Sequence, residues 1–213
     1  MTPPEVYLVD DDPAVLRGVA RLVRAAGWMV SGHASAEAFL AEVPPDAVGC
    51  VVLDVAMPGT DGPALHKRLV DDDRLLETVF LTGHGTLAMG VEAMKVGATD
   101  FLVKPVDDDA LLAAIAEAVR RSVQRQHERL EVESIRRRLE QLTPREREVM
   151  QWVVTGLLNK QIAAELGTAE KTVKVHRARV MEKMQARSLA ELVRLADRVG
   201  LPSPAAGGRA GPA

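Results

Sequence analysis

The sequence has little cysteine and no long apolar run. Its single cysteine, Cys50, has no partner for an internal disulfide. No stretch approaches the roughly 18 consecutive apolar residues that a membrane-spanning helix needs. The first residues also lack the charged start, apolar stretch and cleavage site of a secretory signal. These absences predict a soluble chain with no membrane partner, in a reducing compartment that is most simply the cytoplasm.

The 213 residues carry charge of opposite sign in the two halves of the chain. The length favours two modest domains, and a hydrophobic content of 47% is enough for real cores. Residues 1–122 contain 10 Lys and Arg against 19 Asp and Glu, whereas residues 143–199 contain 11 against 7. The basic second half suggests a polyanionic partner, and a chance imbalance on solvated faces is the alternative.

Short apolar runs alternate with helical patterns through residues 1–122. The runs are EVYLVDDD, GWMVSGHA, GCVVLDV, TVFLTG and ATDFLVKP, and each ends at a turn signal or a polar cluster. The segments between them have apolar residues at the i, i+3, i+4 spacing of amphipathic helices. This alternation predicts an α/β domain with a doubly wound, five-stranded parallel sheet that helices cover on both faces.

The rest of the chain divides into a charged segment, a helical domain and a tail. Residues 123–142 contain no Gly or Pro and only a thin apolar stripe, which predicts a helical linker, with a short two-chain coiled coil as one reading. Residues 143–199 read as short helices joined by Gly-containing turns, an all-α helix-turn-helix domain that starts at Thr143. Residues 200–213 are too poor in large apolar residues to fold, which predicts a disordered tail.

Polar side chains follow the predicted strands at the edge where a doubly wound sheet has its crevice. They are Asp10, Asp11 and Asp12 after the first strand, Asp54 after the third, Thr82 ending the fourth and Lys104 after the fifth. Carboxylates gathered there would repel one another unless a cation joined them, and Mg²⁺ is a hard ion suited to oxygen ligands. The set suits phosphoryl transfer, with Asp54 as nucleophile and Lys104 neutralising phosphoryl charge.

Each of these side chains also has an ordinary structural explanation. An isolated aspartate at a strand end is more often a turn residue or a helix cap. A lone lysine is usually a solvated surface group, and a threonine that ends a strand needs no function. The chemical interpretation therefore depends on the combination of side chains and not on any one of them.

The combination resembles the receiver domain of two-component response regulators. The motifs VDDD, LDVAMPGTDG, TGHGT and DFLVKP match that family in order, spacing and local sequence over about residues 4–122. The resemblance implies that Asp54 accepts a phosphoryl group from a sensor histidine kinase. It also implies a Mg²⁺ site whose ligands are Asp10, Asp11, Asp54 and the main-chain carbonyl of Ala56.

The same resemblance assigns roles to residues of the last two strands. Lys104 would contact the phosphoryl group, and the bond between Lys104 and Pro105 matches a cis peptide of the family. Thr82 and Phe101 would form the switch pair, in which Thr82 turns towards the phosphate and the aromatic ring turns inward. Two positions depart from the family, because Ala56 and Gly83 are small residues that leave the phosphate open to water. We expect them to alter the phosphate lifetime, in a direction that the sequence leaves open.

The second half resembles the helix-turn-helix domain of the LuxR type over about residues 140–199. The matching stretches are LTPREREVM, GLLNKQIAAELG and TVKVHRARVMEKM, and the whole chain looks most like the FixJ branch of response regulators. Residues 171–184 are then the recognition helix, in which Val173, Val180 and Met184 form the core stripe. The candidate DNA contacts are Asn159, Lys160, Lys171, Thr172, Lys174, Val175, Arg177 and Arg179.

The two resemblances together imply a transcription regulator and not an enzyme. Phosphorylation would favour a homodimer that binds double-stranded promoter DNA, with RNA polymerase as a further partner and activation as the more common outcome. One rival is a phosphatase with an aspartyl-phosphate intermediate. The resemblance to such enzymes would require an Asp-x-Asp motif whose second aspartate is the general acid, whereas this chain has Asp54-Val55-Ala56. The other rival is a constitutive DNA-binding protein whose receiver is a dimer scaffold. A further hypothesis is that the acidic receiver masks the basic helix.

Overall fold

The computed structural model describes residues 3–83, 87–202 and 204, which belong to two compact units. The first unit is Met1–His127 and the second is Glu128–Ala213. Each unit has hydrophobic clusters of its own. Within the described residues, no helix has the length and apolar character that crossing a bilayer requires.

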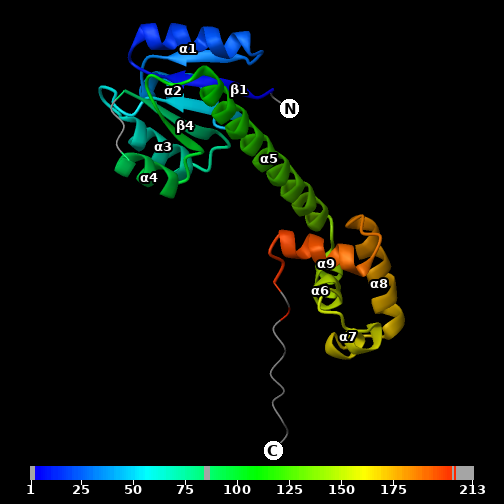
Figure 1. Ribbon diagram of the computed structural model, residues 1–213. Coiled ribbons are helices and arrows are strands. Elements are labelled where there is room, and N and C mark those ends of the chain that lie inside the picture. Colours follow the sequence, from blue (N-terminus) through cyan, green and yellow to red (C-terminus); the bar gives the residue numbers. More distant parts are fainter. Residues whose placement is uncertain (1–2, 84–86, 203, 205–213) are drawn as a thin grey trace, which may run out of the picture. The chain divides into compact units, whose positions relative to one another are not determined.

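The described part of the first unit is built around an all-parallel sheet with strand order β2-β1-β3-β4-β5 (Figure 1). The strands are β1 (Glu5–Val9), β2 (Val30–His33), β3 (Gly49–Leu53), β4 (Glu77–Thr82) and β5 (Asp100–Val103). Each strand overlaps one of the five apolar runs of the sequence, so the predicted doubly wound sheet is confirmed. The winding direction reverses between β1 and β3, which makes their carboxyl ends the expected crevice.

The described helices of this unit lie on both faces of the sheet (Figure 1). They are α1 (Pro13–Ala25), α2 (Ala36–Glu42), α3 (Gly62–Asp71), α4 (Leu87–Lys95) and α5 (Asp108–Glu140). Asp12, Ser35 and Asp61 cap the first three, because each side chain accepts a hydrogen bond from a backbone amide two or three residues later. Residues 84–86, which belong to the predicted motif TGHGT, lie outside the described residues.

Successive residues of the strands face two separate hydrophobic clusters. Tyr7 and Val9 of β1 pack on one face together with Phe39 of α2 and side chains of α3. Val6 and Leu8 of the same strand pack on the other face with side chains of α1 and α5. Because both faces are buried, strands such as GCVVL are apolar throughout. Polar side chains of the sheet are consequently concentrated at the strand ends.

Helix α5 continues without a break through most of the segment predicted as a linker. It contains no Gly or Pro that would end it before Glu140. Leu111 and Ile115 are buried in the first unit, whereas Ile135 is fully buried in the core of the second. The last turns of α5 are therefore a structural element of the second unit and not only a connector, and the coiled coil stays a prediction.

In the described residues, the second unit adds shorter helices to the end of α5. They are α6 (Pro144–Val153), α7 (Asn159–Glu165), α8 (Glu170–Lys183) and α9 (Leu189–Arg198). The predicted helix start at Thr143 is confirmed, because its hydroxyl accepts from the amide of Glu146 while the Glu146 carboxylate accepts from the amide of Thr143. Gly156 and Gly167 follow α6 and α7 with φ angles of 86° and 60°, which favour glycine.

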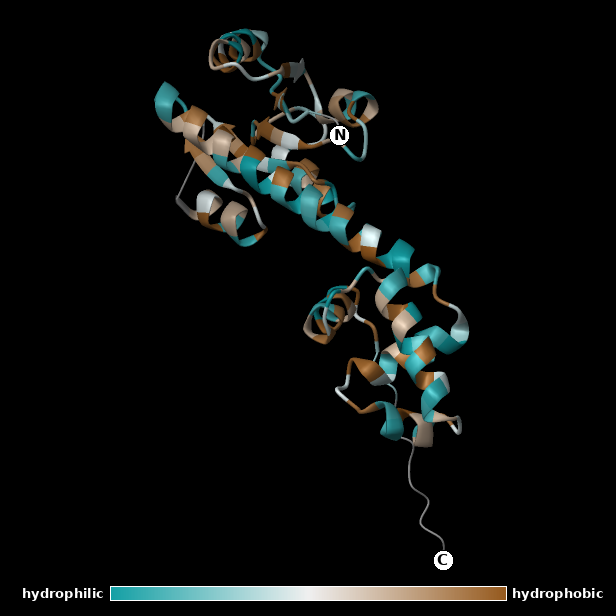
Figure 2. Cartoon of the chain, turned by 90° about the vertical axis from the view of Figure 1, so that its right-hand side faces the viewer, coloured by the Kyte–Doolittle hydropathy of each residue, from teal (hydrophilic) through white to brown (hydrophobic). Residues whose placement is uncertain are grey.

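The core of the second unit gathers one face of each of these helices. Val173, Val180 and Met184 are fully buried, so the predicted core stripe of α8 is confirmed. Figure 2 shows hydrophobic and hydrophilic residues on the same helices, as expected of helices with one buried face. Leu201 packs against this core, and residues 203 and 205–213 of the predicted tail lie outside the described residues.

Candidate functional site

The strand register brings four of the predicted site residues to one edge of the sheet. Asp10 follows β1 and Asp54 follows β3, and the Asp54 amide donates a 2.9 Å hydrogen bond to the carbonyl of Val9. Thr82 ends β4, and its carbonyl accepts a 2.8 Å hydrogen bond from the amide of Lys104, which follows β5. Residues up to 94 positions apart thus meet at the carboxyl ends of parallel strands.

The ammonium of Lys104 bridges the two aspartates. Its Nζ lies 2.6 Å from Oδ2 of Asp10 and 3.0 Å from Oδ1 of Asp54. Both carboxylates are largely buried, with 9% of each side chain exposed, whereas 24% of the Lys104 side chain is exposed. Burial opposes the charge on Lys104, but the hydrogen bonds to Asp10 and Asp54 outweigh it and raise the pKa of the ammonium. Lys104 is therefore a permanent cation at physiological pH.

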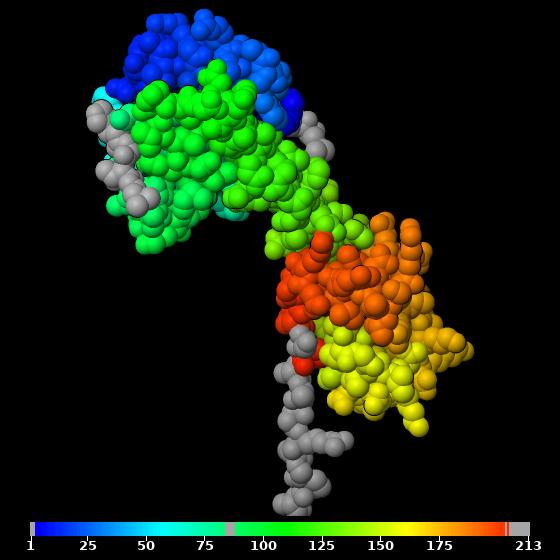
Figure 3. All heavy atoms as spheres, viewed as in Figure 1, coloured from blue at the N-terminus to red at the C-terminus, as the bar shows by residue number. Residues whose placement is uncertain are grey.

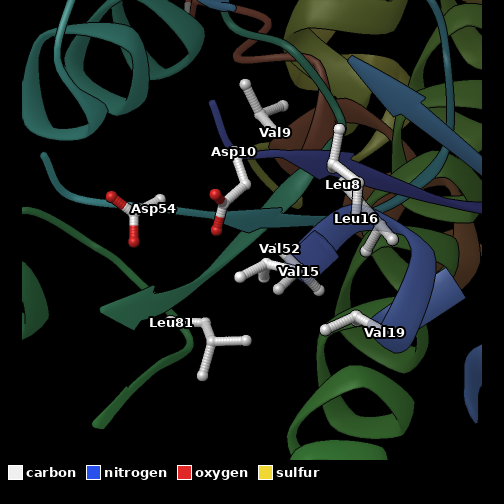
Figure 4. A pocket seen from close by; sticks show the side chains of 9 residues that line it. All are labelled: Leu8, Val9, Asp10, Val15, Leu16, Val19, Val52, Asp54 and Leu81. Atoms are coloured by element: carbon white, nitrogen blue, oxygen red, sulfur yellow. The ribbon is translucent and has the colours of Figure 1, made fainter. Parts of the chain in front are cut away.

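Backbone amides hold the other oxygens of the two carboxylates. Oδ1 of Asp10 accepts a 2.9 Å hydrogen bond from the amide of Asp12, and Oδ2 of Asp54 accepts one of 2.8 Å from the amide of Ala56. Figure 4 shows Asp10 and Asp54 beyond the ends of β1 and β3, with aliphatic side chains of β1, β3, β4 and α1 beside them. The two aspartates are thus fixed in orientation, and with Lys104 they carry a net charge of −1.

A magnesium site fits this donor set in part. The structure brings Asp10 and Asp54 together, while Asp11 is exposed and Ala56 adjoins the pair through its amide. Within the described residues, no group of three His, Cys, Asp or Glu side chains is arranged to hold a metal ion. Two hard, anionic oxygen ligands beside the exposed Asp11 nevertheless suit Mg²⁺, which keeps several waters when bound to proteins.

The predicted switch pair occupies the last two strands. Thr82 is buried, with 1% of its surface exposed. The partly buried ring of Phe101 lies 6.1 Å from the ring of Phe80, measured between centroids. Helix α4 approaches Phe101 closely at Gly90, where an added Cβ would lie 3.3 Å from the ring. The Lys104–Pro105 peptide is cis, as predicted.

The face formed by α4 and β5 exposes large apolar side chains. They are Val91, Met94, Val96 and Val103, and each is between 46% and 49% exposed. Figure 3 shows residues of α4, β5 and the first part of α5, all in shades of green, on one side of the first unit. Such a row is more apolar than a solvated surface requires, so this face fits an interaction with a protein surface.

Helix α8 presents most of the predicted DNA contacts to solvent. Lys171, Thr172, Lys174, Val175 and Arg179 are exposed, and Lys160 is exposed at the start of α7. A helix with an exposed basic face and a buried apolar face matches the geometry of a recognition helix. The residues expected to meet phosphates or bases are therefore accessible.

Arg177 and Asn159 differ from the other predicted contacts because they bind each other. Nη1 of Arg177 donates a 3.0 Å hydrogen bond to Oδ1 of Asn159, and both side chains are half-buried. The bond ties α8 to the start of α7. Arg177 keeps further N–H groups for a DNA contact, but its orientation is set by Asn159.

Models of two protein families match the two units. The family described as "Response regulator receiver domain" matches residues 6–116, which is more than half of the chain, and the family described as "Bacterial regulatory proteins, luxR family" matches residues 140–196. The chain belongs to the response regulators. Both resemblances inferred from the motifs are therefore confirmed at the level of the family.

Relatives place this response regulator among the FixJ-like proteins. "Transcriptional regulatory protein FixJ" of Azorhizobium caulinodans is 45% identical over 197 residues, which cover 92% of this chain and 93% of the relative. The solved structure of the response regulator StyR has a TM-score of 0.82 at 43% identity and covers 92% of this chain and 100% of its own. Full-length FixJ from B. japonicum has a TM-score of 0.56 at 44% identity, with coverages of 95% and 100%. The expected FixJ branch is confirmed.

Two features of this response regulator were not found from its sequence. The guanidinium of Arg138 donates a 2.9 Å hydrogen bond to the carbonyl of Met184, although Arg138 lies in the segment read as a linker. Leu158, just before α7, is 69% exposed. The sequence gives a local indication at Leu158, because an apolar residue stands there at a position where helices usually have a polar cap. No local pattern predicts the contact of Arg138 with Met184.

Proposed function

We propose that Asp54 is phosphorylated by a sensor histidine kinase in the cytoplasm, and that phosphorylation drives dimerisation and promoter binding. The observation that carries this proposal is the bridge of Lys104 to Asp54 and Asp10. An oriented carboxylate faces a fixed cation there, in a crevice with little solvent exposure. Positioning and charge neutralisation are the two requirements of phosphoryl transfer.

The chemical step uses Asp54 as the nucleophile. One of its carboxylate oxygens attacks the phosphorus of a phosphohistidine, a P–O bond forms, and the P–N bond breaks with its electron pair going to the histidine nitrogen, which then takes up a proton. The ammonium of Lys104 neutralises charge on the transferred oxygens. The hydroxyl of Thr82, which ends the adjacent strand, would donate to one of them.

Mg²⁺ would supply additional neutralisation of the phosphoryl oxygens when bound. Asp54 and Asp10 would hold it, with Asp11 and the carbonyl of Ala56 as the further protein ligands. We include Asp11 among the ligands because it is adjacent to Asp10 in the sequence and its carboxylate is exposed to solvent. Lys104 is paired with Asp10 as well as Asp54, so it would keep one ion pair when Asp54 is phosphorylated.

The apolar face of α4 and β5 supports a dimer of this chain. Movement of Thr82 towards the phosphate would open space for the partly exposed ring of Phe101. Helix α4 packs on Phe101 at Gly90, so it would follow the ring. Val91 and Val103 lie on that face. Burying such side chains against a second copy removes apolar surface from water, and the phosphorylated arrangement would favour the contact.

Dimerisation would bring two basic helix-turn-helix units to one DNA site. Linking two weak binders raises the effective concentration of the second, so paired half-sites are bound much more tightly than one. Lys174 and Val175 are exposed where base edges would be read. Transcription activation with RNA polymerase as partner follows as the proposed outcome.

The test compares the chain with and without acetyl phosphate and Mg²⁺, using sedimentation for self-association and fluorescence anisotropy for DNA binding. We expect phosphorylation to produce dimers and tighter binding in the native chain and in Asp46→Asn, an exposed control. Asp54→Asn should lack both responses. Equal binding in all states would mean that the receiver is a scaffold.

We also propose that the protein is not an enzyme with turnover. The residue two after Asp54 is Ala56, so the position of a second catalytic aspartate holds no acid. The acyl phosphate should therefore persist for longer than an enzymatic turnover. Steady release of phosphate from a phosphomonoester substrate, abolished in Asp54→Asn, would instead support the phosphatase alternative.

A further inference from the structure

A pocket of about 610 Å³ lies between α3 and α4 in the first unit. Figure 1 shows these two helices next to each other on the same face of the sheet. Phe80 and Phe101 of the sheet line it, together with Val55, Met89, Ala93 and Val96. Its volume is in the range of sites that enclose small organic molecules, and its lining is mostly apolar, as in such sites.

The rim of this pocket leaves large apolar side chains in contact with solvent. Val70 of α3 is 54% exposed and Val96, just after α4, is 49% exposed. Val70 lines the pocket from α3, and Val96 lines it from the end of α4. A molecule that filled the space would remove both from water, so an apolar occupant gains from the hydrophobic effect.

The polar groups of the pocket already have partners. Nδ1 of the buried His66 lies 3.0 Å from Oγ1 of Thr78, and its Nε2 lies 3.1 Å from the carbonyl oxygen of Val96. Burial is the main cause that lowers the pKa of His66, so the ring is neutral at physiological pH. Its donor and acceptor capacity is thus used inside the protein.

The charged groups at the rim are likewise paired with neighbours on their own helices. Nζ of Lys67 lies 2.5 Å from Oδ2 of Asp71 on α3, and Nζ of Lys95 lies 3.5 Å from Oε2 of Glu92 on α4. Among the described lining residues, these pairs leave no excess charge of one sign on the walls of the pocket. A charged ligand would lose its hydration without gaining an ionic partner.

We propose that this pocket binds a small, uncharged aromatic molecule of one or two rings. The rings of Phe80 and Phe101 offer edges and faces to an aromatic ligand, and the thioether of Met89 adds a polarisable contact. The site is separate from the carboxylate crevice, because none of Asp10, Asp54 and Lys104 lines it.

The binding test is a titration of the full chain with 6-propionyl-2-dimethylaminonaphthalene, an uncharged two-ring probe whose fluorescence shifts in apolar surroundings. We expect saturable binding of one probe per chain, displaced by indole and not by indole-3-carboxylate, which has the same rings with a negative charge. Displacement by both compounds alike, or the absence of saturable binding, would overturn the proposal.

Matched variants locate the bound probe. Ala93→Phe places a phenyl group in the pocket and should weaken binding about tenfold or more. Ala88→Phe makes the same change at an exposed position of the same helix that does not line the pocket, and it should leave binding unchanged. If Ala93→Phe fails to give the native circular dichroism spectrum, Val70→Phe fills the pocket from α3. Equal binding by the native chain and a folded pocket-filling variant would overturn the assignment.

Occupancy of the pocket should be linked to phosphorylation, and this part rests on the proposed function. Val55 lines the pocket directly after Asp54, and Phe101 is the proposed switch ring. Any effect of phosphorylation on ligand affinity has an equal reciprocal effect. We expect acetyl phosphate with Mg²⁺ to change the probe affinity in the native chain and not in Asp54→Asn. An unchanged affinity would overturn the linkage alone, since binding is measured without phosphorylation.

Discussion

Arg138 of α5 holds the C-terminal end of α8, because its Nη1 donates a 2.9 Å hydrogen bond to the carbonyl of Met184. A cation beside the last carbonyls of a helix also interacts favourably with the helix dipole. Since α8 carries the proposed DNA contacts, the stability of its orientation depends on a residue that lies before the helix-turn-helix segment. The last turns of α5 belong to the folding unit of the DNA-binding part.

We therefore predict that Arg138→Ala lowers the free energy of unfolding of the second unit by about 1–2 kcal/mol. Urea unfolding followed by the fluorescence of Trp152, in a Trp28→Phe background, measures it. The exposed neighbour Arg137 is the control, and Arg137→Ala should change stability little. If both variants unfold alike, the bond to Met184 contributes nothing measurable.

Glu146 should make the second unit sensitive to acid. Its carboxylate accepts a 2.6 Å hydrogen bond from Nζ of Lys183 and one from the amide of Thr143, and these bonds, led by that of Lys183, hold its pKa below 4.5. A lowered folded-state pKa contributes stability that is present above 4.5 and is lost as the pH falls through the folded value. Urea unfolding between pH 7 and pH 3 should show this loss.

The matched variants for this prediction are Glu146→Gln and Glu182→Gln. Gln at position 146 removes the titrating group, so its unfolding curve should vary less with pH in the acidic range. Glu182 is exposed on the same helix as Lys183, and its substitution should leave the pH dependence unchanged. The same acid sensitivity in all three proteins would contradict the role of Glu146.

Loss of Lys104 should destabilise the unphosphorylated first unit. Lys104→Gln leaves Asp10 and Asp54 close together without their cation, and we expect a cost of about 1–3 kcal/mol at pH 7. The raised pKa of Lys104 means that its stabilisation is complete below about pH 10.5 and is lost only as the pH rises through the folded value.

The measurement is urea unfolding followed by Trp28 at low ionic strength. Lys95→Gln changes an exposed lysine and serves as the control. Addition of Mg²⁺ should restore part of the lost stability in Lys104→Gln if a divalent cation binds between the same carboxylates. An unchanged midpoint for Lys104→Gln would argue that the bridge is energetically neutral.

Cys50 should react only when the first unit unfolds. The thiol is fully buried in β3, and burial, assisted by the charge of Glu77, raises its pKa far above the usual range. We expect no labelling by a thiol reagent at pH 8 in native buffer and complete labelling in urea above the unfolding midpoint. Rapid labelling of the native chain would show that the central strand opens locally.

Lys174 should contribute to DNA binding through charge. In a titration of a nonspecific duplex at increasing salt, Lys174→Ala should reduce the slope of log K against log salt by about 1 if the ammonium contacts one phosphate. Arg194→Ala, at an exposed position on α9, should leave the slope unchanged. A lower affinity at constant slope would indicate that Lys174 contacts a base edge instead.

The strands of the first unit could be predicted from the sequence because they are short, apolar and regularly spaced. Burial on both faces makes each strand of a parallel sheet a continuous apolar run, as in GCVVL of β3. The positions of Asp10, Asp54 and Lys104 at the strand ends then placed them at one edge. In the second unit, the Thr143 capping box and the buried stripe of Val173 and Val180 could likewise be predicted from the sequence.

The sequence by itself determined the order of the elements and the set of side chains at the sheet edge, since periodicity and caps are local properties of the chain. Only the tertiary structure decided which groups bind each other. Lys104 bridges Asp10 and Asp54, whereas Asp11 stays exposed, and Arg177 binds Asn159. These contacts join residues distant in sequence, so they depend on strand register and helix packing, which no local pattern encodes.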